Sequence, residues 1–433
     1  MFQTKSITDG VQLHLMPTEK FKTVTCRVYV QTALEHDAAL TALVPMVIAR
    51  GSTKFPTMQA IAADLADLYG ARFGSDVTKI GERHLVEYYF EIANDSYLGE
   101  GLGLVHQGMA TLGELVTRPR VEGDGFYGPY VVQEQTNLEN RIRGLIDNKR
   151  GYALQRFLET MFEGEPFATY KYGTLEELSG ITCQGLLEHY RRLMAHSPID
   201  IFVVGDVEPG ILEDQWLDDL AGIRDGYRPI PPGAKWPFPS EVKTATELGD
   251  LQQGILFLGY RTPVTYGSPE YYKLLVYCGV LGGFPHAKLF TNVREKASLA
   301  YYVSARIDAT KGFLMISAGI PPDRYNEAVE IIMHQVEEMN RGAITLDELD
   351  KTKQGLINGL LTMQDSAIAI IDRGLVETIH DIRRDLEEVV TAVRAVTVDD
   401  LVEQGRLLQL DTIYFLQGQM AHTNGAIPTG GKS

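Results

Sequence analysis

The stretch LVPMVIARGSTKFPTMQAIAADLADLYGARF, residues 43–73, has the pattern of two helices followed by a strand. Its first part is almost wholly apolar, which is typical of a buried helix. In its second part, apolar residues recur at steps of three and four between Met58 and Leu68, which predicts one buried helical face. Proline lacks a backbone N–H and disrupts a helix interior. We therefore expect the first helix to begin late, at about Thr41, so that Pro45 stays near its start.

Beyond this stretch, each half of the chain combines short strand patterns with long helical ones. Alternating runs over residues 11–32 predict a β-hairpin, and helical patterns cover residues 99–115 and 130–162. The endings VVGDV at 203–207 and YFLQG at 414–418 occupy equivalent places in the two halves, which indicates a weak internal repeat. We predict an α+β fold of two homologous domains, each a mostly antiparallel sheet packed with helices.

A proline-rich segment divides the chain. RDGYRPIPPGAKWPFPSEV begins at residue 224 and contains five prolines, which restrict φ and remove backbone donors. We predict an N-terminal domain over 1–223, a linker over 224–245 and a C-terminal domain over 246–420. Residues 421–433, rich in small and polar residues, are expected to form a disordered tail.

Composition and charge exclude several classes of protein. The net charge of −17 opposes binding to nucleic acid, and no apolar run approaches the roughly 20 residues that a membrane span needs. The N-terminus has no basic flank followed by an apolar stretch, so we expect no signal peptide. The three cysteines, Cys26, Cys183 and Cys278, are odd in number and widely separated. They predict a reduced, cytoplasmic protein without disulfides.

No catalytic or metal-binding cluster is evident. None of the ten histidines lies three to five residues from another, so no helical face carries a pair of imidazole ligands. The serine-hydrolase pattern GxSxG and the phosphate-binding pattern GxxxxGK[ST] are also absent. The sequence therefore predicts no catalytic residue and no metal ligand within this chain.

The stretch that contains Arg50-Gly51-Ser52-Thr53 and Pro56 resembles the first catalytic segment of the pitrilysin/insulinase family of zinc proteases. In that family the segment begins with H-x-x-E-H. The resemblance places the first His on Ala42, the Glu on Pro45 and the second His on Met46. Alanine has no donor atom, proline has no basic side chain, and a thioether suits Zn²⁺ poorly. The resemblance thus implies that these three positions have lost their metal chemistry.

The third zinc ligand of the family is a Glu further along the chain. The matching stretch here is EQTNLENRI, residues 134–142, and the resemblance places the ligand on Arg141, with Glu134 as the alternative. Downstream matches over residues 152–182 and 189–207 support this register. A lone Glu134 would not make a zinc site in either case. The expectation is a chain without a cofactor of its own.

The second half keeps a family signature. LGGFPHAKLFTNVREKASLAYYVSA, residues 281–305, resembles the family's segment that carries an Arg and a Tyr seven residues apart, here Arg294 and Tyr301. The resemblance implies that these side chains reach into a zinc-bearing domain, hold the peptide backbone and help to polarise the scissile carbonyl. Alternatively, Arg294 is a surface residue paired with a neighbour such as Glu295, and Tyr301 is a half-buried strand aromatic. Tyr302 is expected to face the core, because side chains alternate along a strand.

Three functions follow from these patterns. The favoured one is the non-catalytic subunit of a bacterial two-chain peptidase, in which a homologous partner supplies zinc and this chain binds peptide substrate. The second is a homodimeric peptide-binding or scaffolding protein that takes an extended peptide by strand addition. The third is an independent enzyme with a different kind of site.

Overall fold

The computed structural model describes residues 2–35, 37–98, 102–207, 210, 215–231, 233 and 238–418. The expected tail and positions 232 and 234–237 of the expected linker lie outside this part of the chain. Residue contacts divide the chain into two compact units. Unit 1 comprises Met1–Asn148, Phe162–Trp236 and Ile357–Thr391, and unit 2 comprises Lys149–Met161, Pro237–Leu356 and Ala392–Ser433. Each unit therefore contains segments from both halves of the sequence.

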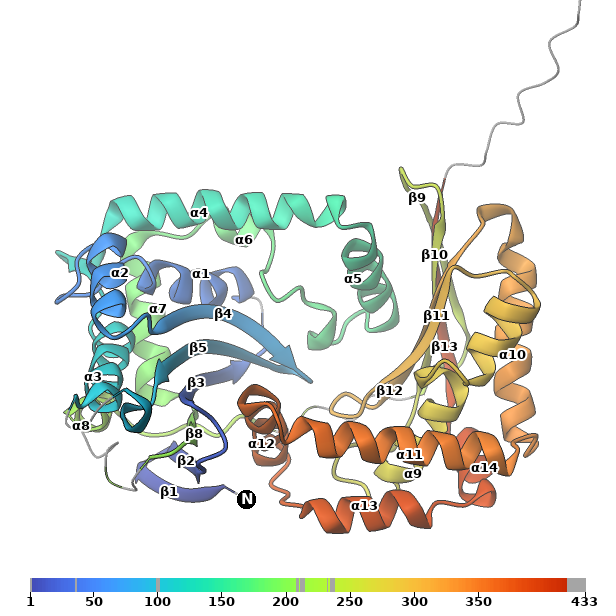
Figure 1. The fold of residues 1–433 in the computed structure, drawn as a ribbon. Coiled ribbons are helices and arrows are strands. Elements are labelled where there is room, and N and C mark those ends of the chain that lie inside the picture. The colour runs from blue at the N-terminus through green and yellow to red at the C-terminus, as the bar shows by residue number, and fades with distance from the viewer. Residues whose placement is uncertain are drawn as a thin grey trace, which may run out of the picture. The chain divides into compact units, whose positions relative to one another are not determined.

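Unit 1 is built on a six-stranded sheet with the order β1-β2-β8-β3-β5-β4 (Figure 1). All of its pairs are antiparallel except β2 with β8. Its strands are β1 (Gln3–Thr8), β2 (Val11–Pro17), β3 (Thr23–Ala33), β4 (Arg72–Ile80), β5 (Arg83–Ala93) and β8 (Ile199–Gly205). A further pair of two-residue strands joins β6 (Val121–Glu122) to β7 (Gly125–Phe126).

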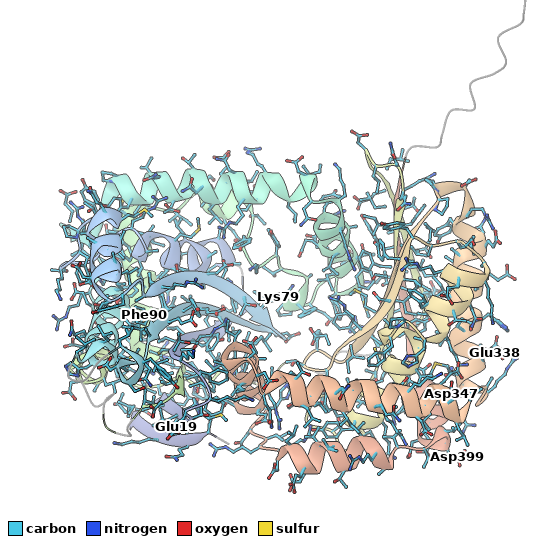
Figure 2. The ribbon with its side chains drawn as sticks, viewed as in Figure 1. Glu19, Lys79, Phe90, Glu338, Asp347 and Asp399 are labelled. Atoms are coloured by element: carbon cyan, nitrogen blue, oxygen red, sulfur yellow. The ribbon has the colours of Figure 1, made fainter. Side chains whose placement is uncertain are left out.

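Helices cover both faces of this sheet. On β5 the side chains alternate, so that Val86, Tyr88, Phe90 and Ile92 are buried in the main core, where Figure 2 labels Phe90. The opposite face carries a smaller cluster around Phe202, against which Leu375 of α12 packs. The helices of unit 1 are α1 (Ala38–Ile48), α2 (Met58–Asp67), α3 (Leu104–Thr117), α4 (Gly128–Arg143), α6 (Leu175–Ser179), α7 (Cys183–His196), α8 (Gln215–Ile223) and α12 (Ala367–Ile379).

Unit 2 repeats this plan with a five-stranded sheet of order β11-β12-β10-β13-β9. Only β13 and β9 are parallel. Its strands are β9 (Lys243–Leu248), β10 (Gly254–Arg261), β11 (Tyr302–Asp308), β12 (Phe313–Ile320) and β13 (Gln409–Gln417). Its helices are α5 (Lys149–Met161), α9 (Tyr271–Cys278), α10 (Tyr325–Asn340) and α14 (Val398–Arg406), and α11 (Leu346–Met363) and α13 (Leu386–Ala395) contribute to both units. The predicted α+β class with two units of sheet and helices is confirmed.

The helical pattern over residues 130–162 forms two helices and not one. A 3₁₀ turn, Gly144–Asp147, separates α4 from α5. The break lets α5 pack on the sheet of unit 2, where Phe157 stacks on Phe257 with ring centroids 5.2 Å apart. Local periodicity did not reveal the break, because both segments keep helical spacing on either side of it.

The expected late start of the first helix was wrong. α1 begins at Ala38 and continues through Pro45, and the Thr41 N–H donates to the Asp37 carbonyl at 2.9 Å. The Pro45 carbonyl accepts a hydrogen bond from Ser75 Oγ of β4 at 2.9 Å. Most of α1 is buried, so packing against the sheet maintains the helix despite the donor that proline lacks.

In the described part of the chain, every helix is too short or too polar to span a membrane.

A buried histidine links α7 to α1. His189 is 1% exposed, and its Nε2 lies 2.9 Å from Thr41 Oγ1. Its Nδ1 lies 2.6 Å from Arg192 Nη2. Since a guanidinium only donates, Nδ1 must accept, and the neutral ring donates its Nε2–H to Thr41. Burial, together with the charge of Arg192, lowers the pKa of His189 to about 3.

This histidine predicts acid sensitivity of folding. In the unfolded chain the His189 pKa returns to about 6.5, so only the unfolded state binds the proton as the pH falls below that value. The contribution of His189 to the free energy of unfolding is complete above about pH 6.5. It declines towards pH 3, by about 1.4 kcal/mol per pH unit. Urea unfolding at pH 7.5, 6 and 5 measures the slope. We expect His189→Gln to reduce it and His196→Gln at the end of α7 to leave it unchanged. Equal slopes in the wild type and His189→Gln would contradict the prediction.

Candidate functional site

Three positions on α1 correspond, by resemblance, to the zinc-binding motif, and the core of unit 1 largely encloses them. Ala42 is 1% exposed and Pro45 is buried. Met46 is half-buried and packs against the same core. None of the three offers an imidazole or a carboxylate, so this surface of α1 has no ligand suited to zinc and no general base.

Glu134 of α4 is already committed to other partners. Its carboxylate is buried, forms an ion pair with Arg50, and accepts hydrogen bonds from Asn137 Nδ2 at 3.1 and 3.2 Å. Arg50 follows the end of α1, so the pair joins the end of α1 to α4. A carboxylate neutralised by a guanidinium in this way serves packing, and its single charge could not hold zinc alone.

Arg141, two turns further along α4, belongs to a polar cluster at β4. Its Nη1 donates to the Tyr172 hydroxyl at 3.0 Å and lies 3.4 Å from Asp76 Oδ1. The guanidinium also lies over the Tyr172 ring, 4.9 Å from its centroid. Lys171 adds a second cation 3.4 Å from Asp76 Oδ2. Cations therefore surround the one carboxylate here, an arrangement that repels Zn²⁺.

The sequence did not predict this cluster as a unit. Asp76 and Lys171 are 95 residues apart, and neither belongs to a recognisable pattern. Ser75 and Asp76 are adjacent on β4, and they contact Pro45 of α1 and Arg141 of α4. The fold thus brings both expected segments of the degenerate metal site to the same strand.

The residues at this site do not fit a zinc ion. Within the described part of the chain, no group of three or more His, Cys, Asp or Glu side chains could hold a metal ion. We expect the purified chain, after dialysis against zinc and then buffer, to retain far less than one zinc per chain by elemental analysis. The reason is the donor set of Ala42, Pro45, Met46 and Arg141. Stoichiometric zinc that only a strong chelator removes would contradict it.

The edge of the unit 1 sheet lies beside this cluster. β4 pairs only with β5, and among the described residues its backbone forms no backbone hydrogen bond to any other segment. Lys171 Nζ donates to the Val77 carbonyl at 2.7 Å, which shows that this carbonyl points away from β5. Alternate residues of an antiparallel strand point the same way, so Phe73 and Ser75 also direct their backbone groups outward. This edge could pair with another extended chain.

Arg294 and Tyr301 both lie at the surface of unit 2. Arg294 is exposed in the π-helical segment Phe290–Lys296, with its guanidinium 4.7 Å from the centre of the Phe290 ring. Tyr301 is 72% exposed, and its N–H donates to the Gly319 carbonyl at 2.9 Å. Tyr301 is therefore not a half-buried strand aromatic. The side chains of both residues are accessible to a ligand.

Tyr302 takes the inward position, as alternation predicts. It is half-buried, its ring lies 4.6 Å from the Arg150 guanidinium, and burial raises the pKa of its hydroxyl. A Cβ at Gly319 would lie 2.5 Å from Tyr302 Cε1, so the glycine makes room for the ring. Tyr302 thus belongs to the packing of the sheet.

Known proteins are similar to this chain over its length. Residues 180–356 match the family model described as "Peptidase M16 inactive domain". A relative from Bacillus subtilis (strain 168), "Probable inactive metalloprotease YmfF", is 34% identical over 417 residues, 96% of this chain and 98% of the relative.

Solved structures share the fold. A conserved protein from Enterococcus faecalis V583 matches with a TM-score of 0.89 and 30% identity, over 96% of this chain and 99% of that chain. A peptidase M16 inactive domain from Pseudomonas fluorescens matches with a TM-score of 0.77 and 16% identity, over 97% of this chain and 99% of that chain.

Proposed function

Because this chain belongs to the M16 family of peptidases, the pitrilysin/insulinase family, as an inactive member, we propose that it is the non-catalytic subunit of a heterodimeric zinc-dependent peptidase. The partner would be a homologous chain with an intact His-x-x-Glu-His helix, and it would supply the zinc. This chain would bind the peptide substrate and position it for cleavage.

The proposal rests on one contrast: the resemblance places residues without ligand chemistry at the metal positions, while Arg294 and Tyr301 match the family's Arg and Tyr. Ala42 and Pro45 are buried and Met46 packs half-buried against the core, as expected for residues freed from chemistry. Arg294 and Tyr301 are exposed, so packing of unit 2 does not account for them. A guanidinium with several donors and a phenol hydroxyl suit a peptide carbonyl that gains negative charge during cleavage.

The edge of β4 supports a role in holding extended peptide. Its outward backbone groups, at Phe73 and Ser75, could form a ladder with a substrate main chain. Such bonds recognise any backbone, while neighbouring side chains select the sequence. Asp76 beside this edge is balanced by Arg141 and Lys171.

We place the complex in a bacterial cytoplasm. The cysteines are free, and Cys26 and Cys278 are buried. Burial raises the pKa of both thiols to about 12, so neither thiolate would form readily at neutral pH. Unpaired, unreactive thiols suit a reducing compartment.

Co-expression with a zinc-bearing M16 relative from the same organism tests the proposal. We expect the two chains to co-elute at heterodimer mass and to cleave unfolded, quenched-fluorescent peptides, with activity lost on chelation and absent from either chain alone. A catalytically silent homodimer that still binds those peptides would instead support the scaffolding function. Cleavage by the zinc-bearing relative alone at the same rate would overturn the two-chain proposal.

A further inference from the structure

A cavity of about 260 Å³ lies within unit 1, on the sheet face opposite the main core. The segment from β1 to the turn after β2 forms one wall. The end of α11, together with α12 and the loop that follows it, forms the other. α12 packs on β8 and β3 in the same unit (Figure 1). None of the residues of the degenerate metal site lines it, and neither do Arg294 and Tyr301.

Part of the cavity wall is apolar. Phe2, Met16 and Phe21 line it from the β1–β2 segment, and Ile370 lines it from α12. These four side chains are only partly buried and pack against the small cluster around Phe202. Covering such accessible apolar surface with an aliphatic group lowers the free energy of the system.

Four cationic side chains and two carboxylates also line the cavity, namely Lys20, Arg373, Arg383, Arg384, Glu377 and Asp385. Lys20 and Arg373 have carboxylate partners. Lys20 lies 2.5 Å from Asp365, and Arg373 lies 2.8 Å from Glu377. Cations therefore outnumber carboxylates at this cavity, although the chain as a whole carries a charge of −17.

Arg383 has hydrogen-bond donors that a ligand can use. Within the part of the chain that the structure describes, its side chain makes one hydrogen bond, from Nη2 to Thr4 Oγ1 at 2.7 Å. A guanidinium has five N–H donors and binds carboxylates through two of them at once. Its remaining donors are thus available to an anion at the cavity.

A chain of hydrogen bonds runs from the surface into the core and links Arg383 and Thr4 to His14 and Asp200. Asp200 Oδ1 accepts from His14 Nε2–H at 2.8 Å, which leaves Nδ1 to accept from the Thr4 hydroxyl, 3.0 Å away. Thr4 Oγ1 in turn accepts from Arg383. His14 is 3% exposed and stacks on Phe202 with ring centroids 4.3 Å apart, so it cannot readily turn.

The geometry points to a binding site for an aliphatic carboxylate: the carboxylate pairs with Arg383, and the carbon chain lies against Phe2, Met16, Phe21 and Ile370. A fully polar anion would leave the apolar walls in contact with water, and a neutral aliphatic group would not use the Arg383 donors. The same chemistry is present in a free medium-chain fatty acid and in the apolar C-terminal residue of a peptide. The site is independent of the proposed peptidase role.

Isothermal titration of the full chain with hexanoate, octanoate and decanoate tests the site. Burying each added CH₂ is worth about 0.8 kcal/mol, so affinity should rise about fourfold per CH₂ until the cavity is full and then level off. N-acetyl-leucyl-leucine tests the second source. Tighter binding of that peptide than of octanoate would assign the site to peptide C-termini, and the reverse order would assign it to free acids.

Variants separate this site from adventitious binding. Arg383→Gln should weaken octanoate about ten- to hundredfold and leave octanol unchanged, because the charge-assisted hydrogen bond is lost. Ala369→Phe, on the cavity wall, should abolish binding of both. Arg191→Gln, an exposed change on α7, is the matched control and should have no effect. Absence of octanoate binding at millimolar concentration, or binding that neither cavity variant changes, would overturn the proposal. Circular dichroism and urea unfolding verify that each variant folds.

Discussion

Replacing Arg294 by alanine is expected to lower kcat/KM of the reconstituted two-chain peptidase at least tenfold, without loss of heterodimer. The exposed guanidinium would stabilise negative charge on the scissile carbonyl, and removal of one such donor commonly costs about 10²–10³ in kcat. The effect should fall mainly on kcat, because the interaction strengthens as the transition state forms. Initial rates of peptide cleavage at several substrate concentrations give both constants.

Three matched variants decide what Arg294 does. Arg294→Lys keeps the charge but loses the forked donors, so partial activity should remain. Tyr301→Phe removes only a hydroxyl from an exposed ring and should also reduce kcat without affecting folding. Arg406→Ala removes an exposed cation elsewhere in unit 2 and should be neutral. Wild-type rates for Arg294→Ala in an intact heterodimer would eliminate the proposed role.

Asp411→Ala is expected to destabilise unit 2 by about 3–5 kcal/mol, the usual cost of removing one member of a buried ion pair. Asp411 Oδ2 lies 2.6 Å from Arg261 Nε, and the two side chains are 2% and 13% exposed. Without Asp411, the Arg261 charge stays buried with poorer compensation, although Nη2 still donates to the Met161 carbonyl at 3.0 Å. Because a chain with two units need not unfold in one step, hydrogen exchange of the β10 and β13 amides gives the local measure.

Lys351→Ala supplies the control for Asp411→Ala. Lys351 and Asp347 form a pair 2.7 Å apart, but both are more than half exposed, so its loss should cost at most about 0.5 kcal/mol. The double variant Arg261→Leu/Asp411→Leu should recover much of the stability that Asp411→Ala loses. If Asp411→Ala and Lys351→Ala had equal effects, the buried pair would not contribute as expected.

Sequence patterns predicted most of the elements but missed features that depend on distant contacts. Alternation predicted the inward position of Tyr302 and the strands β2 and β3. These two strands do not form the expected hairpin, because β8 lies between them in the sheet. Proline chemistry alone gave a late start for α1, and burial of the helix overrode it. The ion pair of Arg261 and Asp411 depends on a β-bulge, since Asp411 is the extra residue where the register of β10 with β13 shifts. No local pattern marks that residue.

The amino-acid order by itself determined the family and the class of fold, and it predicts the loss of zinc chemistry. These depend on which side chains occupy matched positions, and Ala42, Pro45 and Met46 lack suitable ligand atoms in any conformation. Only the tertiary structure decided which polar groups remain accessible. It enclosed Glu134 with Arg50, exposed Tyr301 and brought Arg383 to Thr4, 379 residues away. Exposure and partnership are properties of the packed chain, because burial and hydrogen bonding arise between segments that the sequence keeps far apart.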